Sequence, residues 1–200
     1  MEDNLSNFMI YGTYPAAVKD FEGAIDTLSD YVDGILFKDV FKLADIRRNS
    51  RFVDLVSLLA YRIGSEVSLE SLGNELKKGK KIYFMDLGIR NALIGDFSPL
   101  SERPDAGQLW ENFFFMERVK IHDTLRDRKR IFFWRTKTNK PNKLDFIEVR
   151  NREMEAFECK LSEKAKAKPG NAFLSAYPEC RIHVVTPSNA LPLLGMTDDE

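Results

Sequence analysis

The sequence predicts an α/β protein in which a helical N-terminal region precedes a mixed sheet flanked by helices. Two patterns support this prediction. Apolar residues recur at helical spacing in the first 100 residues, for example at positions 25, 28, 32, 35, 36, 40 and 43. From residue 107 onward, helical segments and β-rich runs follow one another in the order α-β-β-β-α-β, which favours a sheet covered by helices.

The N-terminal elements follow from local signals. Residues 21–45 and 50–63 have amphipathic helical spacing, and the second of these helices is expected to begin at an N-cap, Ser50, and to end at Gly64. Further along, the patterns predict a short helix capped by Ser68, a strand over 82–86, a helix over 89–94 and a linker over 96–106.

The C-terminal elements are more regular. A long helix is expected over 107–125. The expected strands are 131–135, 144–149, 154–161 and 181–187, with one or two short helices within 162–177. The second and third strands are joined by a tight turn at Asn151 and Arg152, so they are predicted to form an antiparallel hairpin.

The composition argues against several classes of protein. With 30 Lys and Arg against 31 Asp and Glu, any contact with nucleic acid must use a local basic patch. No apolar run approaches the roughly 18 residues of a membrane span, and no signal peptide is apparent. Two cysteines and two histidines are too few for a disulfide framework or a structural zinc site, so a cytoplasmic location is expected. Without a G-x-x-x-x-G-K-[ST] loop, the chain is not expected to hydrolyse ATP alone.

The hairpin carries the most informative residues. A turn centred between Asn151 and Arg152 places Asp145 directly opposite Glu158, with their Cβ atoms about 5 Å apart. Lys160 lies on the same face, because side chains two residues apart on a strand share a face. The opposite face is predicted to be the buried one, and it collects Leu144, Phe146, Phe157 and Cys159.

Opposed carboxylates destabilise a strand pair unless something compensates for their charge. A divalent cation would do so, and oxygen ligands suit Mg²⁺ or Mn²⁺. Such an ion polarises a phosphate and activates water, while Lys160 stabilises negative charge or orients the water. Glu111, near the start of the long helix, is a candidate third carboxylate. The structural alternative is that Lys160 only forms an ion pair with Glu158 or Asp145.

Asp145 and the run Glu158-Cys159-Lys160, on the second and third strands of an α-β-β-β-α-β unit, resemble the PD-(D/E)XK nuclease superfamily. The resemblance implies that Asp145 and Glu158 bind the metal and that Lys160 assists the hydrolytic water. It also implies that Glu111 joins them from the first helix. Leu144 stands where the family pattern has proline.

A second resemblance covers nearly the whole chain. Its segments are YVDGILFKDV, KKIYFMDLGIRNALIG, LWENFFFMERVK, FFWRTKTNKPNKLDFIEV and FECKLSEKAK. They are similar to segments of bacterial and archaeal AAA-type ATPases that carry a C-terminal domain of unknown function with the nuclease-like fold. The resemblance implies four parts: an ATPase-lid remnant (1–20), a helical region with a shortened winged-helix element (21–100), a nuclease-like domain (101–190) and a tail (191–200). The ATPase module itself is missing, so a separate ATPase or a second copy of the chain is a candidate partner.

A local basic patch adjoins the candidate site. Residues 118–143 hold ten Lys and Arg against two acidic residues. The candidate DNA contacts are Arg128, Arg130, Arg135, Lys137 and Lys143. A solvated helix end and loop would give the same pattern, and Arg135 has a structural alternative as the ion-pair partner of Asp145 or Glu158.

The leading hypothesis is therefore a DNA-directed accessory region of the ATPase family with a Mg²⁺-dependent phosphodiesterase site. The alternative is a non-catalytic interaction scaffold, or a degenerate fragment, that retains the nuclease-like fold.

Overall fold

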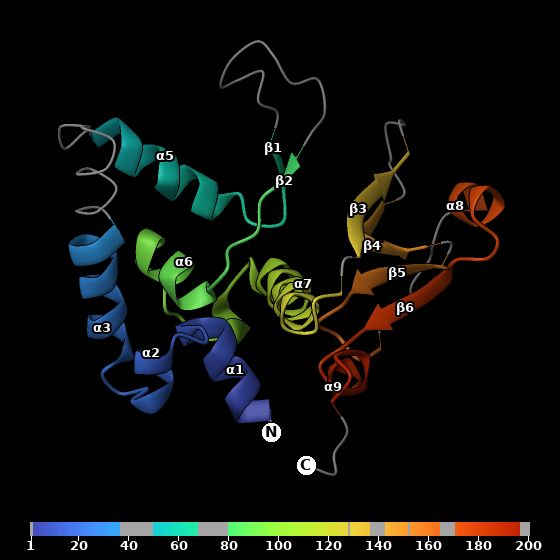
Figure 1. Ribbon diagram of the computed structural model, residues 1–200. Helices are drawn as coiled ribbons and strands as arrows, with labels where there is room; N and C mark the ends of the chain where they lie inside the picture. The colour runs from blue at the N-terminus through green and yellow to red at the C-terminus, as the bar shows by residue number, and fades with distance from the viewer. Residues whose placement is uncertain are drawn as a thin grey trace. The chain divides into compact units, whose positions relative to one another are not determined.

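The chain folds into two compact units, Met1–Phe113 and Phe114–Glu200, in the computed structural model (Figure 1). The structure describes residues 2–36, 50–67, 80–127, 129–136, 143–151, 153–164 and 171–196. No helix within these ranges combines the length and the hydropathy that a bilayer crossing requires.

The N-terminal unit is mainly helical, as predicted. Its elements are α1 (Glu2–Tyr11), α2 (Pro15–Lys19), α3 (Ala24–Asp30), the π-helical segment η1 (Tyr31–Leu36), α5 (Ser50–Tyr61), β1 (Glu66–Val67), β2 (Lys80–Lys81), α6 (Leu87–Ile94), the 3₁₀ turn η3 (Leu100–Glu102) and the first half of α7 (Ala106–Thr124). The predicted helix over 50–63 is confirmed, and Gly64 follows it at a φ of 66°. The expected helix at Ser68 lies outside the described residues.

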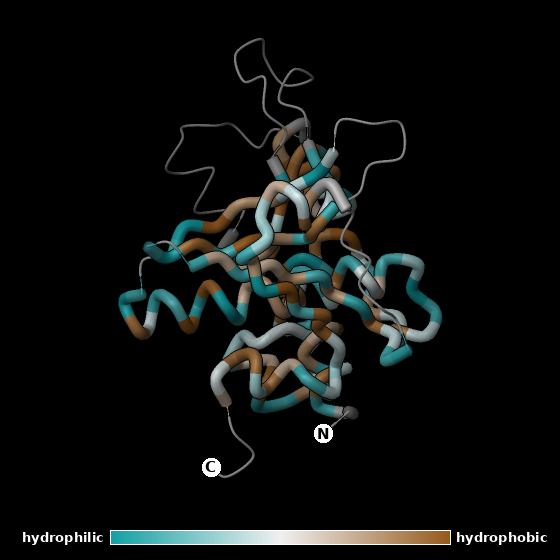
Figure 2. Tube along the Cα trace, turned by 90° about the vertical axis from the view of Figure 1, so that its right-hand side faces the viewer, coloured by the Kyte–Doolittle hydropathy of each residue, from teal (hydrophilic) through white to brown (hydrophobic). Residues whose placement is uncertain are grey.

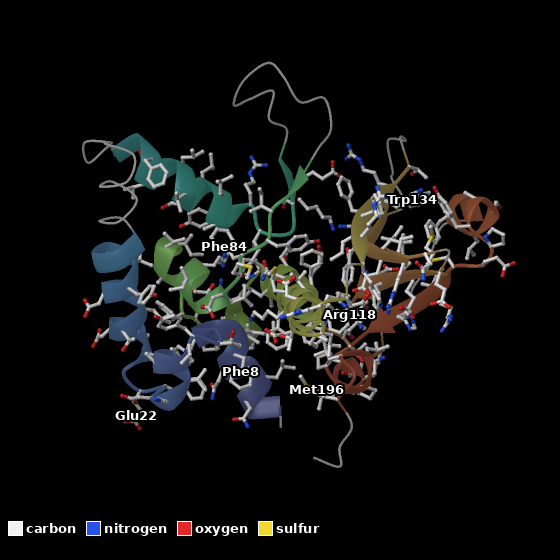
Figure 3. The ribbon with its side chains drawn as sticks, in the orientation of Figure 1. Phe8, Glu22, Phe84, Arg118, Trp134 and Met196 are labelled. Carbon is white, nitrogen blue, oxygen red and sulfur yellow. The ribbon has the colours of Figure 1, made fainter. Side chains whose placement is uncertain are left out.

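The predicted strand over 82–86 is wrong. The strand β2 is only two residues long, and Ile82 forms a single bridge with Ile63. Phe84, labelled in Figure 3, instead bonds through both of its backbone groups to one side chain. Its N–H donates to Oδ1 of Asn112 at 2.7 Å, and its carbonyl accepts from Nδ2 at 2.8 Å. A side chain thus takes the place of the neighbouring strand that a ladder would need.

Asp86 joins two segments that are far apart in sequence. Its Oδ1 accepts the N–H of Ile89 at 2.9 Å and so caps α6, while its Oδ2 accepts the N–H of Thr13 at 2.7 Å. The backbone of α6 approaches that of α1 so closely that a β-carbon on Gly88 would lie 2.1 Å from the carbonyl oxygen of Tyr11. Only glycine fits at this position without a shift of the backbone.

A buried polar cluster stabilises the same region. Asn91 is fully buried, and its Nδ2 donates to the carbonyls of Met9 and Ile10 at 3.1 and 2.8 Å. Its Oδ1 accepts from Arg90 and Arg103 at 3.0 and 3.2 Å. Both arginines also pair with Asp105, at 2.7 and 2.9 Å. Burial raises the pKa of the Asp105 carboxyl, but the two guanidinium groups outweigh burial and hold that pKa below its usual value.

The C-terminal unit contains a four-stranded mixed sheet. Its elements are the second half of α7, then β3 (Arg130–Arg135), β4 (Lys143–Arg150), β5 (Glu153–Cys159), α8 (Asn171–Ala176), β6 (Arg181–Val185) and α9 (Ala190–Leu193). The strand order is β3-β4-β5-β6, antiparallel except that β6 runs parallel to β5. The predicted α-β-β-β-α-β order, and with it the α/β fold class, is confirmed.

Helices cover both faces of this sheet (Figure 1). On one face Phe114 of α7 contacts Phe146 and Phe157, whose own rings stack with centroids 4.7 Å apart. On the other face Phe173 of α8 is fully buried in a cluster with Leu144, Ile147 and Ala156. Figure 2 shows how hydrophobic and hydrophilic residues alternate along the trace of the chain.

The prediction that only one face of the hairpin is buried is therefore wrong. Leu144 was expected beside Phe146 but belongs to the α8 cluster. The pairing of β3 with β4 shifts between Phe132 and Trp134, so that Trp134 pairs with Leu144. Such an irregularity bends a strand and redirects the side chains beyond it.

Replacement of Gly88 tests the close approach of α6 to α1. We expect Gly88→Ala to lower the free energy of unfolding by about 1–3 kcal/mol, because the new methyl group overlaps backbone that cannot move independently. Denaturant unfolding followed by circular dichroism measures this change.

Gly107→Ala is the matched control, since a β-carbon at Gly107 meets nothing within 4 Å. This substitution lies inside a helix and should leave stability unchanged or raise it by up to about 1 kcal/mol. Equal effects of the two substitutions would contradict the contact.

Candidate functional site

The hairpin has the predicted register. Phe146 pairs with Phe157 and Ile147 with Ala156, as the predicted register requires, and Asp145 and Glu158 are the next residues along the two strands. The direct opposition of Asp145 and Glu158 stays a prediction. The backbone pairing of β4 with β5 ends at Phe146 and Phe157. Beyond this pair, Oδ2 of Asp145 accepts a hydrogen bond from the backbone N–H of Cys159 at 2.8 Å. This bond fixes the Asp145 carboxylate against β5.

Lys160 completes this group. Its backbone N–H donates to the carbonyl of Val185 at 2.8 Å, which extends the pairing of β5 with β6 by one residue. Its ammonium lies 2.7 Å from Oε1 of Glu158. Burial lowers the pKa of Lys160, but the hydrogen bond to Glu158 and the charges of Glu158 and Asp145 outweigh burial, so the pKa is raised. The structure thus brings Asp145, Glu158 and Lys160 together, and Lys160 carries a positive charge.

The three residues differ in exposure. Asp145 is buried, with 5% of the whole residue exposed, whereas the side chains of Glu158 and Lys160 are 14% and 35% exposed. Within the described part of the chain, Oε2 of Glu158 is buried and accepts no hydrogen bond. Such an oxygen lacks the compensation that burial of a charged group normally requires.

Glu111 belongs to the N-terminal unit, where it is buried. Its Oε1 accepts from the Lys81 ammonium at 2.8 Å and from the Tyr83 hydroxyl at 2.7 Å. Glu111 is therefore held by a cation and a phenol of its own unit, and its role beside a metal stays a prediction. Among the described residues, no group of three or more His, Cys, Asp or Glu is arranged to hold a metal ion.

The candidate DNA contacts that the structure describes lie at the ends of strands β3 and β4. Arg130 begins β3, and its guanidinium lies 5.2 Å from the ring centroid of Phe132. Arg135 ends the same strand, paired with Lys143 at the start of β4, and both are exposed. Arg128 and Lys137 lie outside the described residues.

Sequence reasoning missed a buried ionic cluster that consists of Glu148, Arg118, His122 and Lys129. Glu148 is 1% exposed, on the face of the sheet that α7 covers. Arg118, labelled in Figure 3, donates from Nε to Oε1 of Glu148 at 2.7 Å and bonds Oε2 through its terminal nitrogen. Lys129 lies 3.1 Å from Oε2, and Nε2 of His122 lies 3.1 Å from Oε1. Arg118 and Lys129 therefore neutralise a core carboxylate, although both counted toward the predicted basic patch.

Burial raises the pKa of Glu148, but the hydrogen bonds from Arg118 and Lys129, together with the nearby His122 imidazole, outweigh burial and lower the pKa to about 2. One sequence signal pointed to this cluster. Glu148 has the same parity on β4 as Phe146, which the sequence assigned to the core, and a carboxylate at a core position requires a cation.

Comparison with known proteins identifies domains without assigned functions. Residues 106–196 match the family model of a domain of unknown function, DUF4143, and residues 2–79 match that of a second domain of unknown function, DUF8612. No curated protein and no solved structure matches the chain. The expected similarity of the C-terminal region to a domain of unknown function is confirmed at this level.

Replacement of Glu148 tests the buried cluster. We expect Glu148→Gln to lower the free energy of unfolding by roughly 3 kcal/mol at pH 7, because buried Arg118 loses its counter-charge. The native pKa lies below the unfolded value of 4.5, so the contribution of Glu148 is present above pH 4.5 and is lost as the pH falls toward 2. Denaturant unfolding of the variant should therefore depend less on pH between 4.5 and 2 than that of the wild type.

Glu153→Gln serves as the control, because Glu153 is an exposed carboxylate at the turn end of the same hairpin. It should change stability by less than about 0.5 kcal/mol. An equal loss of unfolding free energy in both variants would contradict the stabilising role of the buried Glu148 cluster.

Proposed function

We propose that this chain is a DNA-directed accessory region of the AAA-type ATPase family with a Mg²⁺-dependent phosphodiesterase site formed by Asp145, Glu158 and Lys160. The observation that carries the proposal is the convergence of these three side chains, with one buried Glu158 oxygen that has no hydrogen-bond partner among the described residues. The similarity of residues 106–196 to a domain of unknown function agrees with the C-terminal domain that the ATPase resemblance implies.

The donor set fits a hard divalent cation. Mg²⁺ is commonly held by one or two carboxylates together with water and substrate phosphate, and Asp145 and Glu158 supply that number. When bound, Mg²⁺ or Mn²⁺ supplies Lewis-acid polarisation of the phosphate and lowers the pKa of water. Asp145 is oriented for this role by the N–H of Cys159.

The Lys160 ammonium can serve in either of the two roles expected for it, stabilising negative charge or orienting the water. It can donate hydrogen bonds to a phosphate oxygen that gains negative charge. In the hydrolysis the water oxygen bonds to phosphorus, the phosphorus–oxygen ester bond breaks, the water loses a proton to solvent and the leaving oxygen takes one up.

One observation favours the alternative, a non-catalytic scaffold. The Lys160 ammonium already neutralises Glu158 at 2.7 Å, which is the structural alternative for this lysine. A scaffold or degenerate fragment would keep this ion pair and would have no need of a metal. Metal binding separates the two functions.

Cleavage assays test the proposed function. The purified chain should cut plasmid, linear or single-stranded DNA in Mg²⁺ or Mn²⁺ and lose at least about 100-fold in rate in Asp145→Ala and Lys160→Ala. Isothermal titration with Mn²⁺ should show binding that Glu158→Gln weakens.

Lys164→Ala is the matched control, because Lys164 is exposed and lies four residues beyond Lys160. Its rate should equal that of the wild type. A folded wild-type chain that neither binds Mn²⁺ nor cuts DNA would support the scaffold and overturn the proposal.

A further inference from the structure

A pocket rich in arginine lies at the turn end of the hairpin, within the C-terminal unit. Its volume is about 410 Å³. Its lining comes from the end of α7, the start of β3 and the turn after β4: Arg126, Asp127, Arg130, Val149, Arg150 and Asn151. We refer to these six residues as the arginine pocket.

The arginine pocket has an excess of positive charge. Asp127 is its one acidic residue, and it already lies 3.3 Å from Nε of Arg150. Within the described part of the chain, neither Arg126 nor Arg130 forms an ion pair with a carboxylate. Arg126 and Arg130 are exposed, and guanidinium groups match phosphate oxygens in geometry.

The backbone at Arg126 is a second observation. Arg126 has a φ of 52°, and it follows α7 at the position where a glycine usually ends a helix. Its N–H donates to the carbonyl of Asp123 at 3.2 Å, and the next N–H donates to that of His122 at 2.8 Å, as in a Schellman motif. A residue with a β-carbon is less favourable than glycine in this conformation, so a glycine at position 126 should keep the end of α7 intact.

An aromatic ring stands beside the pocket. Phe132 is 44% exposed on β3, which is an edge strand of the sheet. It shares a face with Arg130, two residues away, whose guanidinium lies 5.2 Å from the ring centroid. Exposed aromatic rings with neighbouring cations stack on nucleic-acid bases, but only on bases that are unpaired.

From these features we infer that the arginine pocket binds a backbone phosphate of single-stranded DNA, while Phe132 stacks on a neighbouring base. This inference rests on the proposed DNA-directed function and names the form of DNA. Duplex DNA offers the same phosphates, but its bases are stacked within the helix.

The distance along β4 sets the length of DNA required. Arg150 ends the strand, and Asp145 lies five residues before it, or about 17 Å at strand spacing. At the duplex spacing of roughly 3.4 Å per nucleotide this distance corresponds to about five nucleotides, and a more extended single strand spans it with fewer. A 12-nucleotide strand is therefore long enough to reach both.

Fluorescence anisotropy with the full chain in EDTA tests the inference without cleavage. A labelled 12-nucleotide thymidine strand should bind about 10-fold more tightly than a 12-base-pair duplex. Phe132→Ala should weaken binding of the strand by roughly 10-fold and leave duplex binding within twofold. Equal affinity for the two forms, with no effect of Phe132→Ala, would overturn the inference.

Arg126→Gly provides a variant that cannot lose binding through unfolding, because glycine is the preferred residue at this cap. It should weaken binding of the strand and reduce the slope of log K against log salt by about 0.7, which is the value for one lost phosphate contact. Lys164→Ala should change neither quantity. An unchanged slope in Arg126→Gly would exclude the arginine pocket as the phosphate site.

The same reagents separate this inference from the proposed phosphodiesterase. Binding of the strand is measured in EDTA, where no cleavage occurs, and cleavage is measured with the same wild-type chain in Mg²⁺. A wild-type chain that prefers the strand but never cuts would overturn the phosphodiesterase and support the arginine pocket. An Asp145-dependent nuclease with no preference for single strands would overturn this inference alone.

Discussion

Glu148 and Arg118 form a buried ion pair that joins helix α7 to the middle of the sheet in the C-terminal unit. Transfer of a carboxylate from water to a protein interior costs several kcal/mol, so Glu148 is tolerable only while its cations stay in place. Arg118 bonds both carboxylate oxygens, packs 4.8 Å from the ring of Phe157 and donates to the carbonyl of Leu193. One guanidinium group therefore fixes α7, β4, β5 and the end of α9 relative to one another. A hydrophobic contact in its place would allow α7 to slide, because apolar packing has no direction.

Burial of both faces of the sheet explains where its polar side chains are available for chemistry. The middle of β4 and β5 is covered by α7 on one side and by α8 on the other. Polar groups that are to meet a ligand are then more accessible toward the two ends of the hairpin. Asp145, Glu158 and Lys160 lie at one end of the hairpin, and the arginine pocket lies at the other. The two proposed sites thus share one rigid hairpin, which favours precise placement of side chains.

Much of the C-terminal unit could be predicted from its sequence, because its determining signals are local. The turn at Asn151 fixes the register of the hairpin as far as the pair of Phe146 and Phe157, which Asp145 and Glu158 follow along the two strands. Features set by distant partners could not be predicted. The strand expected over 82–86 is absent because Asn112, 28 residues after Phe84, satisfies its backbone. The Glu148 cluster depends on Arg118, 30 residues away. The second buried face depends on Phe173, which lies 26 residues from Ile147 in the sequence. The metal, the DNA contacts and the role of Glu111 remain predictions.

The edge position of β3 has a consequence for the behaviour of the protein at high concentration. An edge strand presents unpaired backbone groups to which another chain can add, and β3 carries four apolar residues in succession, Ile131 to Trp134. Arginine occupies both ends of this strand. If two copies of β3 paired antiparallel about their common centre, Arg130 of each would face Arg135 of the other at both ends. The like charges repel one another, so the two arginines disfavour aggregation through pairing of the exposed β3 edges.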